Sequence, residues 1–160
     1  MSIKTMLKNN VARLIGQCKG IMRMYEDNRK CADILVQLSA IASSINTCSK
    51  KIFDFHIEEC LTVLENPKRE LDELKAMLAT INTSAEEGTL EDVIHALERS
   101  QDGDDCIDIL QEFRHAYAIV IYNAGALFSH HLSHVILSDT DGSASAELKE
   151  MTNLYFKMLK

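Results

Sequence analysis

Three residues whose side chains bind soft metal ions stand at fixed spacings in the first half of the chain. They are Cys31, His56 and Cys60. His56 and Cys60 are four residues apart, so on a helix they share one face and can hold one ion. Thiolate and imidazole ligands at low coordination number favour Cu(I), with Zn(II) next. We therefore expect a metal site and Cu(I) as its preferred ion.

Helix length decides which of these residues can meet. Cys31 lies 25 residues before His56 on one predicted helix, and a rise of about 1.5 Å per residue separates them by about 38 Å. Metal–ligand bonds are only about 2.0–2.3 Å long, so both residues cannot bind one ion on the same helix. If two long helices pack antiparallel, the start of one lies level with the end of the other. The spacing thus predicts a site built across a pair of long helices.

Composition and periodicity predict an all-α fold. One proline and six glycines are too few for a protein made of many strands and turns. Apolar residues recur at spacings of three and four, the pattern of amphipathic helices. We predict helices over residues 11–25, 29–64, 67–81, 90–97, 106–137 and 148–158, with breaks at 26–28, 82–88, 100–105 and 139–143.

The order of a short, a long and a short helix occurs twice. Sliding the sequence on itself by 75 residues matches two ligand types, Cys31 with Cys106 and His56 with His131. We predict an antiparallel helical bundle of two tandem three-helix repeats, a pseudo-dimer within one chain. The predicted units are a first repeat over 1–82, a linker over 83–88 and a degenerate, acidic second repeat over 89–160.

The repeat offers two ways of completing the metal site. Pairing of the two long helices of one chain would join Cys106 to His56 and Cys60. The reciprocal site would hold Cys31 and His131, with Val in place of the second thiol. Pairing between two chains would instead restore Cys31 to the His56 and Cys60 of the other copy. The sequence leaves both arrangements open.

The other thiols and histidines have simpler interpretations. Cys18 and Cys48 lack such partners, and we expect them to be core thiols. The cluster of His130, His131 and His134 lacks the glutamate of a zinc-protease motif, and we interpret it as the polar end of a helix. An odd number of cysteines on helical segments indicates reduced thiols. Together with the lack of a signal peptide, this predicts a cytoplasmic protein without a membrane segment.

Charge is divided unevenly along the chain. Residues 1–83 carry 12 Lys and Arg against 10 Asp and Glu, whereas residues 84–160 carry 5 against 14. Residues 1–30 carry 7 basic side chains against 2 acidic ones, so this segment would meet a polyanion if any does, the alternative being a solvated helix surface. The cations available for phosphate contacts are Lys4, Lys8, Arg13, Lys19 and Arg23.

Three motifs in the first half occur in register. They are Gly-Gln-x-x-Gly-Ile at 16–21, Asn-Arg-Lys-Cys-Ala-Asp-Ile-Leu at 28–35 and His-Ile-Glu-Glu-Cys at 56–60. Over about residues 5–80 the chain resembles the CsoR/RcnR/FrmR group of bacterial helical repressors, which sense copper, nickel or cobalt, formaldehyde or persulfides. The resemblance implies an antiparallel dimer with the metal site between subunits, and assemblies on operator DNA. Here the assembly would be a homodimer of the tandem chain.

The chain departs from this group at two kinds of position. Copper-sensing members commonly have Tyr before the first Cys, where this chain has Lys30 and, in the second half, Asp105. Arginines that such repressors use on the first and second helices are replaced by Asn10 and Thr47.

We therefore predict a metal-responsive transcriptional repressor that releases DNA when Cu(I) binds. One alternative is a thiol-based sensor of persulfides or aldehydes on the same scaffold. Another is a metal- or cofactor-binding protein that has lost DNA binding. We do not expect an enzyme, because the sequence contains no nucleophile–base pair beyond these ligands and no phosphate loop.

Overall fold

Helices account for nearly all of the chain that the structure describes. The computed structural model describes residues 3–60, 67–81, 84–138 and 145–159. Within these ranges there is no strand, which confirms the all-α prediction. The elements are α1 (Ile3–Glu26), α2 (Cys31–Phe55), the π-helical turn η1 (His56–Cys60), α3 (Pro67–Ile81), α4 (Leu90–Ser100), α5 (Cys106–Ser138) and α6 (Ser145–Met158).

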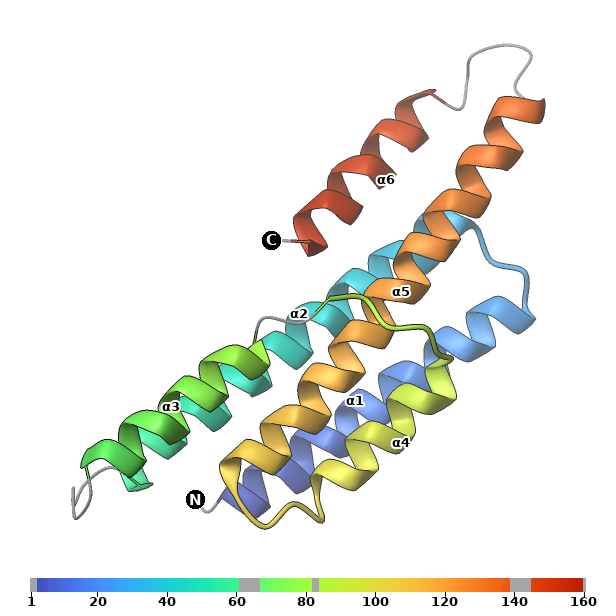
Figure 1. The fold of residues 1–160 in the computed structure, drawn as a ribbon. Coiled ribbons are helices and arrows are strands. Elements are labelled where there is room, and N and C mark those ends of the chain that lie inside the picture. Colours follow the sequence, from blue (N-terminus) through green and yellow to red (C-terminus); the bar gives the residue numbers. More distant parts are fainter. Residues whose placement is uncertain (1–2, 61–66, 82–83, 139–144, 160) are drawn as a thin grey trace.

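The two long helices form the centre of the molecule. α2 and α5 run antiparallel and make the most extensive helix–helix contact (Figure 1). α1 and α4 lie along one side of this pair, and α3 and α6 lie along the other (Figure 1). α3 packs against α5, and α6 packs against α2. Each half of the chain thus places its last helix on the long helix of the other half. This reciprocal packing is what two tandem repeats would produce, and the duplication itself stays a prediction.

The core is built from the apolar faces that the periodicity indicated. On α2 the predicted inward residues Ile34, Leu38, Ile41, Ile45 and Ile52 are all buried. Burying one such side chain stabilises a fold by about 1.5–3 kcal/mol. By length and composition alone, Cys31–Glu58 could also cross a membrane. The core helix of a soluble protein passes the same test, and this one is the core helix here.

The break between α1 and α2 has a local cause. Asn28 adopts a left-handed backbone with φ of 53°, a conformation that Asn tolerates better than most residues. The Arg29 N–H then donates to the Met24 carbonyl at 3.0 Å and closes the end of α1. Lys30 flanks α2 with an extended backbone. α2 therefore begins at Cys31, two residues after the predicted start.

The end of α2 differs more from the prediction of one helix over 29–64. The α-helix stops at Phe55, and His56–Cys60 form a π-helical turn. The His56 N–H is shared between the carbonyls of Ile52 and Phe53. Single π-turns inside or at the end of α-helices occur frequently at functional sites. Residues 61–66 lie outside the described residues.

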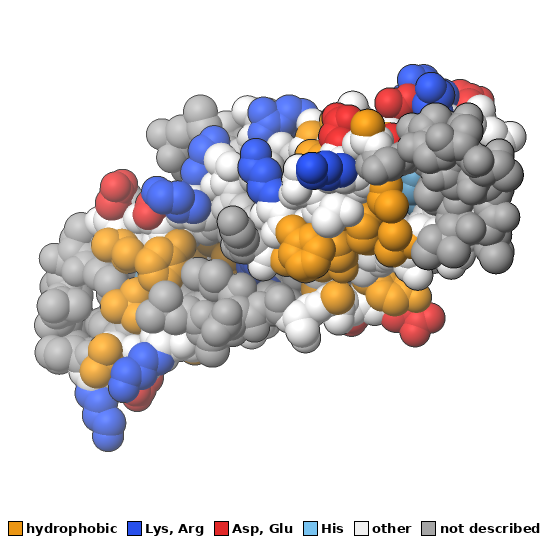
Figure 2. Space-filling model, turned by 90° about the horizontal axis from the view of Figure 1, so that it is seen from above, with side chains coloured by type: hydrophobic (Ala, Val, Ile, Leu, Met, Phe, Trp, Pro, Cys, Tyr) orange, Lys and Arg blue, Asp and Glu red, His pale blue; other side chains and the backbone are white. Residues whose placement is uncertain are grey.

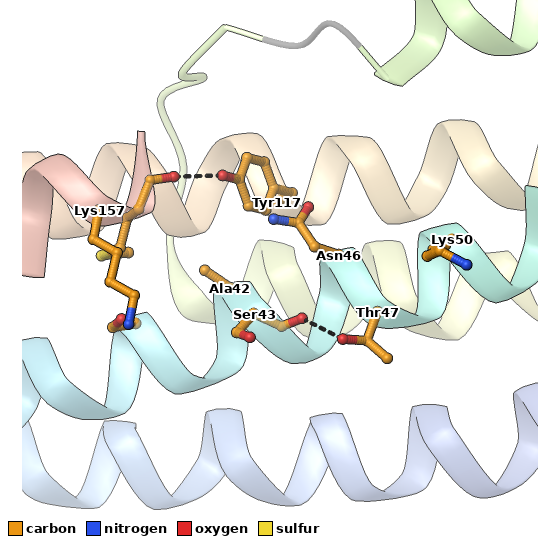
Figure 3. Close-up of a pocket in the computed structure, with 9 residues that line it drawn as sticks. Ala42, Ser43, Asn46, Thr47, Lys50, Tyr117 and Lys157 are labelled. Carbon is orange, nitrogen blue, oxygen red and sulfur yellow. Dashed lines mark hydrogen bonds between the residues drawn. The ribbon is translucent and has the colours of Figure 1, made fainter. Parts of the chain in front are cut away.

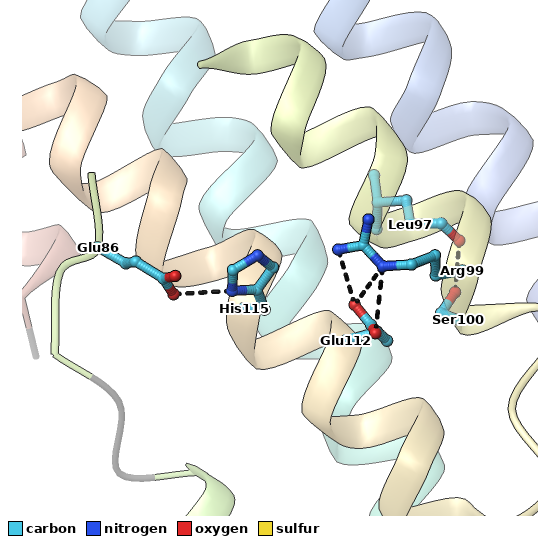
Figure 4. Close-up of polar contacts among 6 residues, drawn as sticks. All are labelled: Glu86, Leu97, Arg99, Ser100, Glu112 and His115. Carbon is cyan, nitrogen blue, oxygen red and sulfur yellow. Dashed lines mark hydrogen bonds and ion pairs between the residues drawn. The ribbon is translucent and has the colours of Figure 1, made fainter. Parts of the chain in front are cut away.

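The segment before α4 is fastened to α5. Thr89 and Asp92 form a capping box, with Asp92 Oδ2 accepting from the Thr89 N–H at 2.8 Å. Upstream, Glu86 Oε2 lies 2.7 Å from His115 Nδ1 (Figure 4). The Asn123 side chain donates to the Gly88 carbonyl at 3.0 Å. These contacts hold the connection between the two halves along the central helix.

Several hydrophobic side chains remain on the surface. Figure 2 shows them gathered in two areas of the upper face, with Lys and Arg side chains between and around them. Leu71, on α3, is 51% exposed. On α6, Phe156 is 59% exposed.

Candidate metal centre

One cavity brings together the end of α2 and the start of α5. It has a volume of about 310 Å³, and both His56 and Cys106 line it. Antiparallel pairing of the two long helices was expected to bring these two residues together. The other lining residues are Ile3, Lys4, Phe55, Glu73, Asp104, Asp105 and Ile109.

His56 is the most unusual side chain in this cavity. It is 6% exposed, and neither imidazole nitrogen has a hydrogen-bond partner among the described residues. Glu73 of α3 approaches, but its Oε2 lies 4.0 Å from His56 Nε2, which is too long for a hydrogen bond. Buried polar atoms without partners are rare, and each calls for an explanation such as an ion or a ligand.

Cys106 supplies a thiol to the same cavity from the opposite helix. It is the first residue of α5 and is 6% exposed. The third predicted ligand, Cys60, closes the π-helical turn that begins at His56, and its side chain lies outside the described residues. In the described part of the chain, no three His, Cys, Asp or Glu side chains gather closely enough to hold a metal ion. The structure therefore brings two of the three residues that were predicted as intrachain ligands to one cavity.

Cys31 and His131 belong to the other end of the central pair. Cys31 begins α2, and His131 lies near the end of α5. Burial raises the pKa of the Cys31 thiol, and the negative charge of Glu147 on α6 raises it further. The His131 Nε2 is buried without a hydrogen-bond partner among the described residues. This end therefore offers one half-buried thiol and one imidazole.

Cys18 and Cys48 are core thiols, as predicted. They are 0% and 1% exposed. Burial raises the pKa of Cys18 to about 12. Burial also raises the pKa of Cys48, although the positive charges of Lys51 and Arg13 act in the opposite direction. Neither thiol is favoured as a reactive group, because nucleophilic chemistry requires the thiolate.

The predicted phosphate contacts are on the surface of α1. Lys8, Lys19 and Arg23 are exposed. Arg13 is exposed too, and one of its nitrogens donates to Asn10 Oδ1 at 3.3 Å. Lys4 differs, because its Nζ donates to the carbonyls of Gln101 and Gly103 at 2.8 and 2.7 Å.

A second cavity, of about 360 Å³, lies between α2, α5 and α6 (Figure 3). Its lining contains the hydroxyls of Ser43 and Thr47 and the ammonium groups of Lys50 and Lys157. The Tyr117 hydroxyl donates to the Met158 carbonyl at 2.7 Å, which ties α6 to α5 there. The described lining has no Cys or His, and its one soft ligand atom is the thioether sulfur of Met158.

Sequence reasoning missed three features near these sites. Glu73 reaches His56 from α3, and no local motif marks it. Lys4 was expected to contact phosphate, whereas it holds a loop nearly a hundred residues away in sequence. Arg114 is 6% exposed, with its guanidinium 4.3 Å from the Tyr117 ring centre and donating to Asn46 Oδ1 at 2.6 Å. The only signal for Arg114 was a charge within the apolar face of α5.

Comparison with known proteins finds relatives of the first half of the chain. A family model described as metal-sensitive transcriptional repressor matches residues 3–82. The copper-sensing repressor RicR of Mycobacterium tuberculosis is 37% identical over 62 residues, which are 36% of this chain and 65% of that protein. The copper-sensing repressor CsoR of Bacillus subtilis is 34% identical over 58 residues, which are 36% of this chain and 57% of that protein. No solved structure matches the chain significantly.

The family match covers the first half of the chain. The chain covers less than two thirds of the length of these curated relatives. The matched family consists of regulators rather than enzymes, which agrees with the prediction that the chain is not an enzyme. Because the family model covers half of its length, the chain belongs to the family of metal-sensitive transcriptional repressors.

Proposed function

We propose that the chain is a cytoplasmic, Cu(I)-responsive transcriptional repressor whose metal site lies within one chain. The observation that carries this proposal is the cavity shared by His56 and Cys106. The partnerless nitrogens of His56 fit a ligand that binds imidazole. In the proposal His56, Cys60 and Cys106 hold the ion. Two thiolates and one imidazole favour Cu(I), and Zn(II) is the second choice.

Metal binding would act through the relative position of the long helices. His56 follows α2 and Cys106 begins α5, so one ion held by both would fix these helices against each other. Metal binding would release DNA only if the metal-bound conformer binds DNA less tightly than the metal-free conformer does. α1 carries the basic surface and packs on α2 and α4 through its apolar face, so the position of that surface would respond to their arrangement.

The site is tested by an anaerobic Cu(I) titration against a chromophoric chelator. Cys106→Ala, His56→Ala and Cys60→Ala should each lose tight binding, because each removes one ligand. Cys31→Ala and the core control Cys48→Ala should retain it. Loss of binding in Cys31→Ala with retention in Cys106→Ala would replace the intrachain site by one formed between two chains of a homodimer.

The repressor role is tested by a mobility shift with the DNA upstream of the chain's own gene. We expect binding without metal and release with Cu(I). A second candidate function is a metal-binding protein that has lost DNA binding. The engagement of Lys4 with carbonyl groups and of Arg13 with Asn10 favours it. Absence of a shift in both states, with Cu(I) binding retained, would select that second function.

A further inference from the structure

We propose that Lys4 is a positioning residue for the metal site, which it serves by fastening the loop over 101–105 to α1. Its Nζ donates to the Gln101 carbonyl at 2.8 Å and to the Gly103 carbonyl at 2.7 Å. The loop leads directly into Cys106, the first residue of α5. The inference rests on the proposed function, in which Cys106 is a ligand.

Within the described residues, two further contacts hold this loop to its own half of the chain. Arg99, at the end of α4, pairs with Glu112 of α5 at 3.2 Å (Figure 4). Asp105 Oδ1 accepts from the Asp108 N–H at 2.9 Å and caps the first turn of α5. These contacts join α4 to α5, whereas the contact of Lys4 joins both helices to α1.

Close packing transmits the position of the loop to Cys106. A Cβ atom on Gly103 would lie 2.7 Å from Ile109 Cγ1 and 3.2 Å from the Ile109 backbone nitrogen. The loop therefore rests directly on the first turn of α5, the turn that begins with Cys106. A group that holds the Gly103 carbonyl thus also holds this turn.

The charges around the cavity give Lys4 a second effect. Lys4 lines the cavity together with the carboxylates of Glu73, Asp104 and Asp105. Cys ligands lose their protons when they bind a metal, which adds negative charge. The ammonium of Lys4 offsets part of that charge. Through the same charge, the presence of metal in the site would affect α1, the helix that carries the predicted phosphate contacts.

The positioning role is tested first without metal. Lys4→Met should increase the rate at which iodoacetamide alkylates Cys106 several-fold, because the loop is released. Lys8→Met, one turn further along α1 and also exposed, is the matched control and should leave the rate unchanged. Lys4→Arg should restore the slow rate, since it keeps the charge and the donors.

Two outcomes would overturn the role of Lys4. One is equal alkylation of Cys106 in Lys4→Met and Lys8→Met. The other is an increase in the alkylation rate of Cys48 by the same factor as that of Cys106. Cys48 is 1% exposed, so its acceleration would mean that the whole protein opens.

The effect on the site itself is measured by Cu(I) affinity. Lys4→Met should weaken binding about three- to tenfold, the range that the net contribution of one typical intramolecular hydrogen bond gives. Lys8→Met should bind as the unaltered chain does, and an unchanged affinity in Lys4→Met would contradict the proposal. If Cu(I) binding does not need Cys106, the proposed function fails, while the alkylation rates still decide whether Lys4 holds the loop.

Discussion

At the residue scale, His56 stands apart from the other buried polar groups of the chain. A buried thiol such as Cys18 or Cys48 packs as a small hydrophobic group and needs no partner. A buried imidazole without hydrogen bonds loses the solvation of both nitrogens, at a cost of about 1–3 kcal/mol for each unsatisfied group. The chain keeps such a residue at the end of its central helix. This cost is offset if His56 binds a ligand.

Burial predicts the order in which the described thiols react. Cys31 is half-buried, whereas Cys18 is fully buried with a pKa of about 12. A raised pKa leaves little thiolate below that pH, so alkylation of Cys18 should keep accelerating above pH 9. At pH 8 we expect iodoacetamide to modify Cys31 first and Cys18 and Cys48 last, as followed by peptide mass spectrometry. Reaction of Cys18 as fast as Cys31 in the folded protein would contradict this order.

The sharing of one cavity by His56 and Cys106 was one of two arrangements that the spacing allowed, because the relative levels of residues on two antiparallel helices follow from helix geometry. The positions of Glu73 and Lys4 at this cavity could not be predicted from spacing. Both depend on how α3 and the loop over 101–105 pack against distant parts of the chain, and no local spacing records such contacts. Cys60 satisfies the predicted spacing, and its role as a ligand stays a prediction.

At the element scale, apolar periodicity predicted the helices but not all of their ends. The buried faces of α1 and α2 follow the spacing of three and four residues. The end of α1 was readable because Asn28 lies in a polar break. The π-helical turn at His56 was not, because one added residue in a turn changes the apolar pattern less than a break does. The exposure of Leu71 was not readable either, because an apolar stripe does not reveal whether another element covers it.

Close packing of α6 on α5 requires a glycine. A Cβ atom on Gly125 would lie 2.8 Å from Tyr155 Oη, and the Tyr155 ring is held by stacking on Phe128 with centroids 5.4 Å apart. Gly125→Ala should therefore lower the free energy of unfolding by about 1–3 kcal/mol, the usual cost of overpacking. Urea denaturation measures this change.

Gly16 provides the matched control for this prediction. It lies in α1, and a Cβ atom there would meet nothing within 4 Å. Gly16→Ala should raise the free energy of unfolding by about 0.5–1 kcal/mol, because alanine has the higher helix propensity. In a Tyr155→Phe background, which removes the close oxygen, Gly125→Ala should cost less. An equal cost in both backgrounds would mean that Tyr155 is not the cause.

At the scale of the whole molecule, similar packing is combined with opposite charge. The two halves exchange their last helices across the central pair, yet residues 1–83 have a net charge of +2 and residues 84–160 one of −9. In a symmetric dimer both halves would present equal surfaces to DNA. Here the acidic half repels a polyanion, so we expect DNA to meet only the surface of α1.

Salt dependence tests this one-sided contact. Each phosphate neutralised by a cation contributes about −0.9 to the slope of log K against log salt concentration on duplex DNA. Lys8→Ala and Arg13→Ala should each make the slope shallower by about one and weaken binding to all sequences alike. Lys157→Ala removes an exposed cation from the acidic half and should leave the slope unchanged. The measurement is a titration of the upstream DNA at four or more salt concentrations. A shallower slope for Lys157→Ala, with none for Lys8→Ala, would place the DNA on α6 instead.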